Sequence, residues 1–224
     1  MITAKAIIAI APAAAKYADE LVKQAAEAGI QANPLRMSMF LGQIHVESGG
    51  FATVVESLNY SAKALKTIFG EHRITHAQAD KYGRTESHAA DQATLGNILY
   101  GGPWGAKNLG NTQPGDGYRF RGRGLKQLTG RDNTRRFSLW WLGDESLLEN
   151  PDRIAQPDGA VASAVWFWSS KKLNEIADTG SVAAVTKVVN GGSIGIQDRI
   201  IWTEKYRKAW SEKADFSDVS ARVS

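Results

Sequence analysis

Glu47 is the residue whose type and place in the sequence most strongly indicate chemistry. It lies near the end of a periodic segment, residues 34–48, that predicts a helix. With about 100° per residue, the apolar stripe of this helix consists of Met37, Phe40, Leu41 and Ile44. Glu47 falls within that stripe, where burial disfavours the ionised carboxylate, and the partial negative charge at a helix C-terminus acts in the same direction. Both effects favour a glutamic acid that stays protonated near neutral pH, as a general acid requires.

Glu56 offers a second carboxyl group nine positions downstream, beyond the glycine pair 49–50. Hydrolysis of a glycosidic bond uses two carboxyl groups, one to protonate the leaving oxygen and one to act as nucleophile or to activate water. If the chain turns back after the helix, the two carboxylates face each other across a groove. Spacing alone leaves two alternatives open: Glu47 could pair with an arginine such as Arg36 or Arg123, and Glu56 could be an ordinary surface glutamate.

A glycine-rich stretch, residues 115–130 (GDGYRFRGRGLKQLTG), carries groups that could hold a sugar. Glycines let the backbone approach a ligand closely, and Tyr118 offers a flat face. Gln127 and Thr129 project from one side if the segment is extended, so an amide and a hydroxyl could hold substrate and water. The Arg-Gly-Arg-Gly run could also bind RNA or phosphate, but it is not a Walker loop and lacks the setting of a dinucleotide fold. We expect no nucleic-acid partner.

No metal or cofactor is expected. His72 and His76 have a metal-compatible helical spacing, but the glutamate of a His-Glu-x-x-His motif is missing. The sequence has no cysteine, which excludes disulfides, a thiol nucleophile and a cysteine metal site. The aromatic residues at 166–168 and at 140–141 are expected to pack in the core rather than to bind sugar.

The composition fits a globular protein with a substantial core: 224 residues, 43% hydrophobic and 22% charged. The formal net charge of +4 suits an anionic partner such as a bacterial wall, an outer-membrane lipid surface or nucleic acid, without choosing among them. The apolar residues 6–15 are preceded by a single lysine and interrupted by Pro12. They predict the first helix of the mature domain rather than a cleaved signal peptide.

The elements that must position these side chains are mostly helical. Helices are predicted over residues 34–48, 61–69, 76–83, 159–172, 181–189 and 196–213. Asn33, Asp158 and Ser181 are the expected N-caps. The glycines and prolines of residues 101–124 predict an irregular loop, which leads into a short strand at 118–121. The expected fold is one mostly helical α+β domain over residues 1–224, with a small β element beside a cleft and no separate wall-binding module.

Five blocks of the sequence, taken in order, resemble glycoside hydrolase family 19, the chitinase family, and most closely its phage and prophage endolysin branch. The blocks are residues 45–51, 58–62, 117–130, 164–168 and 189–192, the last followed by Arg199. The resemblance runs from about residue 30 to residue 210. Residues 100–105 (YGGPWG) match no block of the family, so substrate contacts around this loop stay open.

The resemblance implies a lysozyme-like helical domain with a cleft between two lobes, and hydrolysis with inversion at the anomeric carbon. An inverting enzyme keeps its carboxyl groups far enough apart to admit a water. By matching positions, Glu47 would be the general acid, Glu56 the general base, and Thr129 a holder of the attacking water. The residues expected to contact substrate or to support the catalytic pair are Tyr60, Tyr118, Gln127, Asn190 and Arg199.

The predicted function is that of an endolysin, a monomer that hydrolyses the β-1,4 bond between N-acetylmuramic acid and N-acetylglucosamine in bacterial peptidoglycan. The anionic outer-membrane surface is a second candidate partner. By resemblance, the protein is made in the bacterial cytoplasm and reaches the wall in the periplasm through a holin-type pore. Two alternatives stay open: a chitinase acting on N-acetylglucosamine polymers, and a non-catalytic binder of wall glycan or nucleic acid that uses the arginines of residues 119–123.

Overall fold

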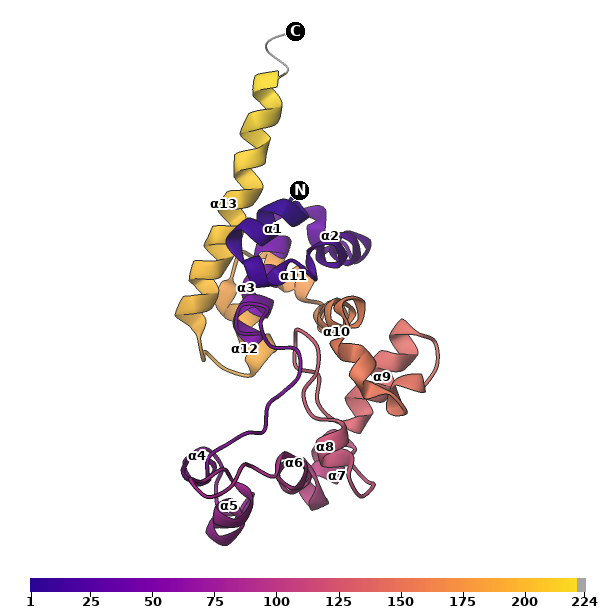
Figure 1. The fold of residues 1–224 in the computed structure, drawn as a ribbon. Coiled ribbons are helices and arrows are strands. Elements are labelled where there is room, and N and C mark those ends of the chain that lie inside the picture. Colours follow the sequence, from indigo (N-terminus) through magenta and orange to yellow (C-terminus); the bar gives the residue numbers. More distant parts are fainter. Residues whose placement is uncertain (221–224) are drawn as a thin grey trace. The chain divides into compact units, whose positions relative to one another are not determined.

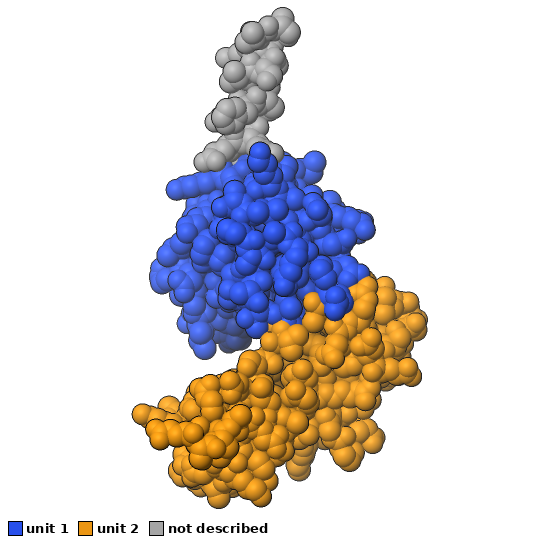
Figure 2. Space-filling view, viewed as in Figure 1, with its two compact units in different colours: residues 1–54, 124–126, 156–224 blue, residues 55–123, 127–155 orange. Residues whose placement is uncertain are grey.

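The computed structural model describes the backbone of residues 1–220 and the side chains of residues 1–210. The chain divides into two compact units, shown in two colours in Figure 2. Unit 1 comprises residues 1–54, 124–126 and 156–224, and unit 2 comprises residues 55–123 and 127–155. No helix in the described residues is long and apolar enough to cross a bilayer.

The prediction of a mostly helical fold is confirmed (Figure 1). The helices of unit 1 are α1 (Ala4–Ile10), α2 (Ala18–Glu27), α3 (Pro34–Glu47), α10 (Pro157–Ser170), α11 (Leu173–Asp178), α12 (Val182–Asn190) and α13 (Ile196–Ser220). Those of unit 2 are α4 (Ala62–Ile68), α5 (His76–Tyr82), α6 (Gln92–Tyr100), α7 (Gly102–Leu109), α8 (Asp116–Arg119) and α9 (Arg131–Trp141). The β structure of the described residues consists of isolated bridges, such as Val55 with Arg123 and Arg123 with Leu128.

Helix α3 is the central helix of unit 1. Its start follows from local chemistry: the side chain of Asn33 accepts a hydrogen bond from the backbone N–H of Arg36, and Pro34 occupies the first turn. Every residue from Met37 to His45 is buried, so the helix is enclosed on all sides rather than along one stripe. This enclosure changes which groups surround Glu47 at its end.

The long helix α13 packs against α3, and at Gly42 the two helices approach each other closely. A Cβ atom at Gly42 would lie 2.5 Å from Oγ1 and 2.9 Å from the backbone nitrogen of Thr203. Only a residue without a side chain allows this approach. Gly42 therefore sets the distance between the helix that ends at Glu47 and the helix that carries Arg199.

Gly42→Ala is expected to destabilise the protein by about 2–3 kcal/mol, because overpacking forces backbone shifts in a close-packed core. Urea unfolding followed by circular dichroism measures the change. Gly192→Ala is the matched control, since a Cβ there would meet nothing within 4 Å. It should change stability by less than about 0.5 kcal/mol. Equal stability of the two variants would contradict the close packing at Gly42.

Unit 2 has its own small core, which consists of Leu58, Leu65, Ile74, Ala79, Leu95 and Leu99. The helices predicted over 61–69 and 76–83 are confirmed as α4 and α5. Ser61 caps α4, and Thr75 forms a capping box with Gln78 at the start of α5.

The predicted irregular loop over residues 101–124 is wrong, because this stretch contains α7 and α8. Gly101 is the N-cap of α7, Pro103 lies in its first turn, and Gly110 ends it with a left-handed φ of 67°. These residues mark helix ends rather than irregular chain. The strand predicted at 118–121 is also wrong: α8 covers its first two residues, and the other two lie in no strand.

Two smaller predictions also fail. Asp158 is not the N-cap of α10; Gln156 is, because Pro157 with its fixed φ takes the first helical position. Trp140 is not in the core, since 50% of its surface is exposed on α9. In contrast, Trp168 is buried as predicted, with its ring edge-on to Phe40.

Candidate active site

The carboxylate of Glu47 is held between two cations within unit 1. Its Oε1 accepts a hydrogen bond from Arg199 at 2.6 Å, and its Oε2 accepts one from Lys126 Nζ at 2.9 Å. The side chains of Glu47 and Lys126 are each 15% exposed, and that of Arg199 is 4% exposed. Both ion pairs are largely shielded from solvent, so loss of either partner would leave a buried charge uncompensated.

Glu47 therefore has two cationic partners, whereas the stripe predicted apolar surroundings alone. The alternative that Glu47 pairs with an arginine is confirmed, but the arginine is neither of the two that were named. Arg36 binds Asp178 near the start of α3, and Arg123 binds an aspartate of unit 2. The helix stripe located Glu47 correctly but could not show which distant side chains meet it.

Arg199 connects Glu47 to the loop after α12. It donates to Gln43 Oε1 at 2.6 Å and to the carbonyl oxygen of Ile194 at 3.3 Å. Asn190 donates to the same carbonyl at 2.7 Å and accepts from the backbone N–H of Gly192. Two of the predicted site residues, Asn190 and Arg199, thus meet at one backbone oxygen and fix the position of the guanidinium beside Glu47.

His45 forms an uncharged, packed support beside this site. Its Nδ1 lies 2.9 Å from the hydroxyl of Tyr206, and its ring stacks on Trp202 with centroids 3.5 Å apart. Burial, with a smaller effect from the charge of Lys205, lowers the pKa of His45 to about 4. Burial likewise raises the pKa of Tyr206 above its usual range. Both side chains are therefore neutral near pH 7.

The neutral His45 predicts acid sensitivity. Its pKa of about 4 in the folded state lies below the unfolded value of about 6.5, so its contribution to stability is present above pH 6.5 and is lost as the pH falls to 4. The total loss is about 3 kcal/mol. Urea unfolding at pH 7 and pH 4.5 should show a smaller drop in His45→Gln than in wild type. His88→Gln, which changes an exposed ring, should behave like wild type. An equal drop in all three proteins would rule out the role of His45.

Glu56 begins unit 2 and is held by two donors of that unit. Its Oε1 accepts from the hydroxyl of Tyr100 at 2.5 Å, and its Oε2 accepts from the backbone N–H of Gly122 at 3.0 Å. The backbone N–H of Glu56 also donates to the carbonyl of Gly122. The alternative of an ordinary surface glutamate therefore fails. Burial, and then the charge of Glu56, raise the pKa of Tyr100 and of Tyr60, so both hydroxyls keep their protons.

Gln127 lies beside Glu56, but not by the predicted geometry. The segment is not extended at Gln127, whose φ of 56° is left-handed. The hydroxyl of Thr129 turns back and donates to the carbonyl of Gln127 at 3.0 Å. A Cβ at Gly122 would lie 2.8 Å from Gln127 Oε1 and 3.4 Å from Glu56 Oε2. Gly122 therefore leaves the space in which the Gln127 amide and the Glu56 carboxylate converge.

Tyr118, from α8, presents only part of its ring to a ligand. The guanidinium of Arg121 covers one face at 4.1 Å from the centroid, and the Tyr118 backbone N–H is bound by Asn97. Tyr60 packs edge-on against Phe69.

Sequence reasoning missed Lys126 and Tyr100, which bind the candidate catalytic carboxyl groups, and Gln43, which binds Arg199. Gln43 has a signal, being a polar residue on a fully enclosed helix. Lys126 stands inside a matching block but was given no role, and Tyr100 starts the block without a family match. In the described residues, no cluster of three or more His, Asp or Glu side chains is arranged to hold a metal.

Known proteins provide an independent test of the chain's family. A protein of Haemophilus influenzae, described as a glycosyl hydrolase family 19 domain-containing protein, is 38% identical over 169 residues, which are 75% of this chain and 76% of that protein. No family model matches the chain.

Solved structures share the fold. Chitinase C from Streptomyces griseus superposes with a TM-score of 0.60 at 18% identity, over 93% of this chain and 76% of that one. A bacterial family 19 chitinase gives 0.58 at 20% identity, over 93% and 94% of the two chains. With this fold and with 38% identity to a relative over most of both proteins, the chain belongs to glycosyl hydrolase family 19 and is a chitinase-like glycoside hydrolase.

Proposed function

We propose that this hydrolase cleaves the β-1,4 bond between N-acetylmuramic acid and N-acetylglucosamine in bacterial peptidoglycan. In this proposal it acts as an endolysin that reaches the wall from the cytoplasm through a holin-type pore. The observation that carries the catalytic part is the pair of carboxyl groups, Glu47 and Glu56, each held by its own set of donors. The choice of peptidoglycan over uncharged chitin rests on the net charge of +4 and on the likeness to the endolysin branch.

Glu47 is the proposed general acid. When it gives its proton to the leaving oxygen it becomes an anion, and Arg199 and Lys126 stabilise that anion at short distance. The stabilisation grows as the proton leaves, so it lowers the barrier rather than only holding the ground state. Arg199 is the better oriented of the two, because Gln43 and the Ile194 carbonyl fix its guanidinium.

Glu56 is the proposed general base. Tyr100 and the N–H of Gly122 donate to its two oxygens and hold the carboxyl group in place to accept a proton from water. Gln127 and Thr129 are proposed to hold the substrate and the attacking water beside it, and Tyr60 to line the same region. Attack by water on the face opposite the leaving group inverts the anomeric carbon, so a β bond yields an α product.

Mass spectrometry of digested sacculi tests the proposal, with chitin oligomers as the comparison substrate. We expect soluble fragments with N-acetylmuramic acid at the reducing end, and clearing of chloroform-permeabilised Gram-negative cells. Reducing ends of N-acetylglucosamine would assign a different bond. Cleavage of chitin oligomers alone would favour the chitinase alternative. Persistent binding without new reducing ends would favour the non-catalytic binder.

A further inference from the structure

Two adjoining pockets of unit 2 differ sharply in charge. The first, here the neutral pocket, has a volume of about 520 Å³ and is lined by glycines, prolines and the polar side chains of Asn97, Asn111, Thr112 and Gln113, with no charged residue. The second, here the arginine pocket, has a volume of about 500 Å³ and is lined by Tyr118, Arg119, Arg121, Arg123, Glu149 and Asp152. Asn97, Pro114 and Gly115 line both, so the two pockets lie next to each other.

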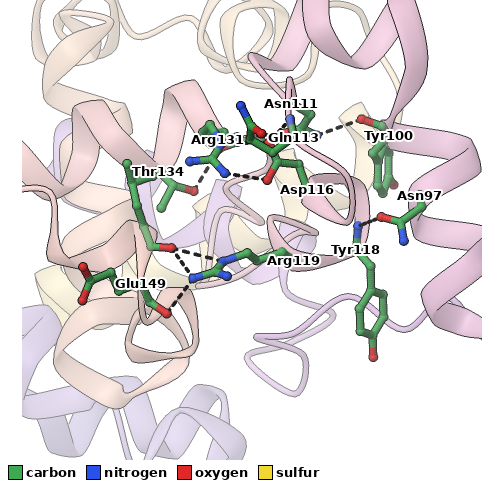
Figure 3. Close-up of polar contacts among 12 residues, drawn as sticks. Asn97, Tyr100, Asn111, Gln113, Asp116, Tyr118, Arg119, Arg131, Thr134 and Glu149 are labelled. Atoms are coloured by element: carbon green, nitrogen blue, oxygen red, sulfur yellow. Dashed lines mark hydrogen bonds and ion pairs between the residues drawn. The ribbon is translucent and has the colours of Figure 1, made fainter.

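The neutral pocket has a preformed wall that leads toward Glu56. Asp116 and Arg131 form a bidentate ion pair, with N···O distances of 2.7 and 2.8 Å (Figure 3). Asp116 is 2% exposed and also accepts from the backbone N–H of Gln113. Asn111 accepts from the backbone N–H of Arg131 and donates to the carbonyl of Tyr100, whose hydroxyl binds Glu56. Tyr100 therefore connects the pocket wall, which binds its backbone carbonyl, to the proposed base, which binds its hydroxyl.

The arginine pocket holds one guanidinium that differs from the other two. Arg119 donates to the carbonyl oxygens of Leu148 and Glu149, and Arg123 is bound to Asp152 (Figure 3 shows the first set). Arg121 instead lies over the ring of Tyr118 and donates one bond to the Tyr118 carbonyl. It has no ion-pair partner in the described part of the chain. A guanidinium has five N–H donors, so Arg121 can bind a carboxylate with two of them.

We infer that the two pockets divide one muropeptide. The neutral pocket takes the uncharged acetamido sugar, whose hydroxyl and amide groups suit a wall of glycines and side-chain amides. The arginine pocket takes the stem peptide, and Arg121 binds one of its free carboxylates. This inference rests on the proposed function, because chitin has no peptide and no carboxylate. It makes the stem peptide a determinant of specificity.

The test compares two forms of the same glycan strand, released from cross-links by an endopeptidase. One form keeps its stem peptides. The other has lost them to an N-acetylmuramoyl-alanine amidase, and the lactyl carboxylates that this hydrolysis frees are then converted to methyl amides, so that the stripped strand carries no carboxylate. New reducing ends give kcat/KM for each form. Arg121→Gln is expected to lower kcat/KM on the peptide-bearing strand by about tenfold, as for loss of a charge-assisted contact. Its effect on the stripped strand should be at least about fivefold smaller. Arg121→Lys keeps the positive charge but cannot form two parallel hydrogen bonds to a carboxylate, so its kcat/KM on the peptide-bearing strand should lie between those of wild type and Arg121→Gln.

Arg135→Gln is the matched control, since Arg135 is an exposed arginine of the same unit that pairs with Glu145 and lines neither pocket. It should match wild type on both strands. Equal losses of Arg121→Gln on the two strands, or no loss on the peptide-bearing one, would overturn the inference. If Arg121→Gln unfolds at the assay temperature, the effect of added salt on the wild-type protein serves as the test instead. Salt should slow cleavage of the peptide-bearing strand more than cleavage of the stripped strand. An equal effect on the two strands overturns the inference. A wild type that cleaves chitin oligomers but neither strand would instead overturn the proposed function.

Discussion

Glu47→Gln is expected to lower kcat for glycan hydrolysis by roughly 10³-fold, because the amide cannot protonate the leaving oxygen. KM should change little, since the side chain keeps its shape and size. Reducing-end assays on sacculi measure the loss. A variant that clears permeabilised cells at the wild-type rate would show that Glu47 is not the proton donor.

The same substitution should also cost stability. Arg199 and Lys126 would face a neutral amide instead of an anion, and Arg199 is 4% exposed. Removing one partner of such a buried ion pair costs about 3–5 kcal/mol, and an amide oxygen that still accepts one bond reduces this to about 1–3 kcal/mol. Glu204→Gln is the control, because its pair with Arg207 is exposed. It should keep full activity and lose less than about 1 kcal/mol.

Glu56→Ala is expected to lower kcat by roughly 10²–10⁴-fold, because no base remains to activate water. Azide should restore turnover, since this small anion needs no deprotonation and fits the space left by the carboxylate. The product followed by NMR should be the α-glycosyl azide, because attack still comes from the face opposite the leaving group. A β-azide would refute inversion. Glu145→Ala, which removes an exposed carboxylate of unit 2, should need no rescue.

Local signals predicted about half of the helices in the described residues. Asn33 with Pro34, Ser61 and Ser181 all start helices as expected, because capping depends on residues within one turn of each other. The wrong prediction of a loop over residues 101–124 has the same origin. Glycines and prolines occur at the ends of helices as well as in loops, and local sequence does not distinguish the two. The exposure of Trp140 depends on which other elements pack against α9, and the periodicity of the sequence does not show this.

The candidate site was only partly predictable. The helix stripe identified Glu47, but Lys126 and Arg199 are 79 and 152 positions away, and no local period links residues so distant. Resemblance supplied Arg199, whereas Tyr100 lay in the stretch without a family match. The left-handed φ of Gln127 is rare for a residue with a side chain, so the extended reading of its segment failed.

The enclosure of α3 has a consequence for protein synthesis. Gln43 and its partner Arg199 are 156 positions apart, so the apolar residues of α3 leave the ribosome long before α13 exists. At about 5–20 residues per second, that interval is on the order of 10 s. Unit 2 is made within it and can complete its own core, whereas the nascent first segment of unit 1 stays uncovered. Residues 37–45 therefore lack the cover of α13 throughout that interval, and slower elongation prolongs it.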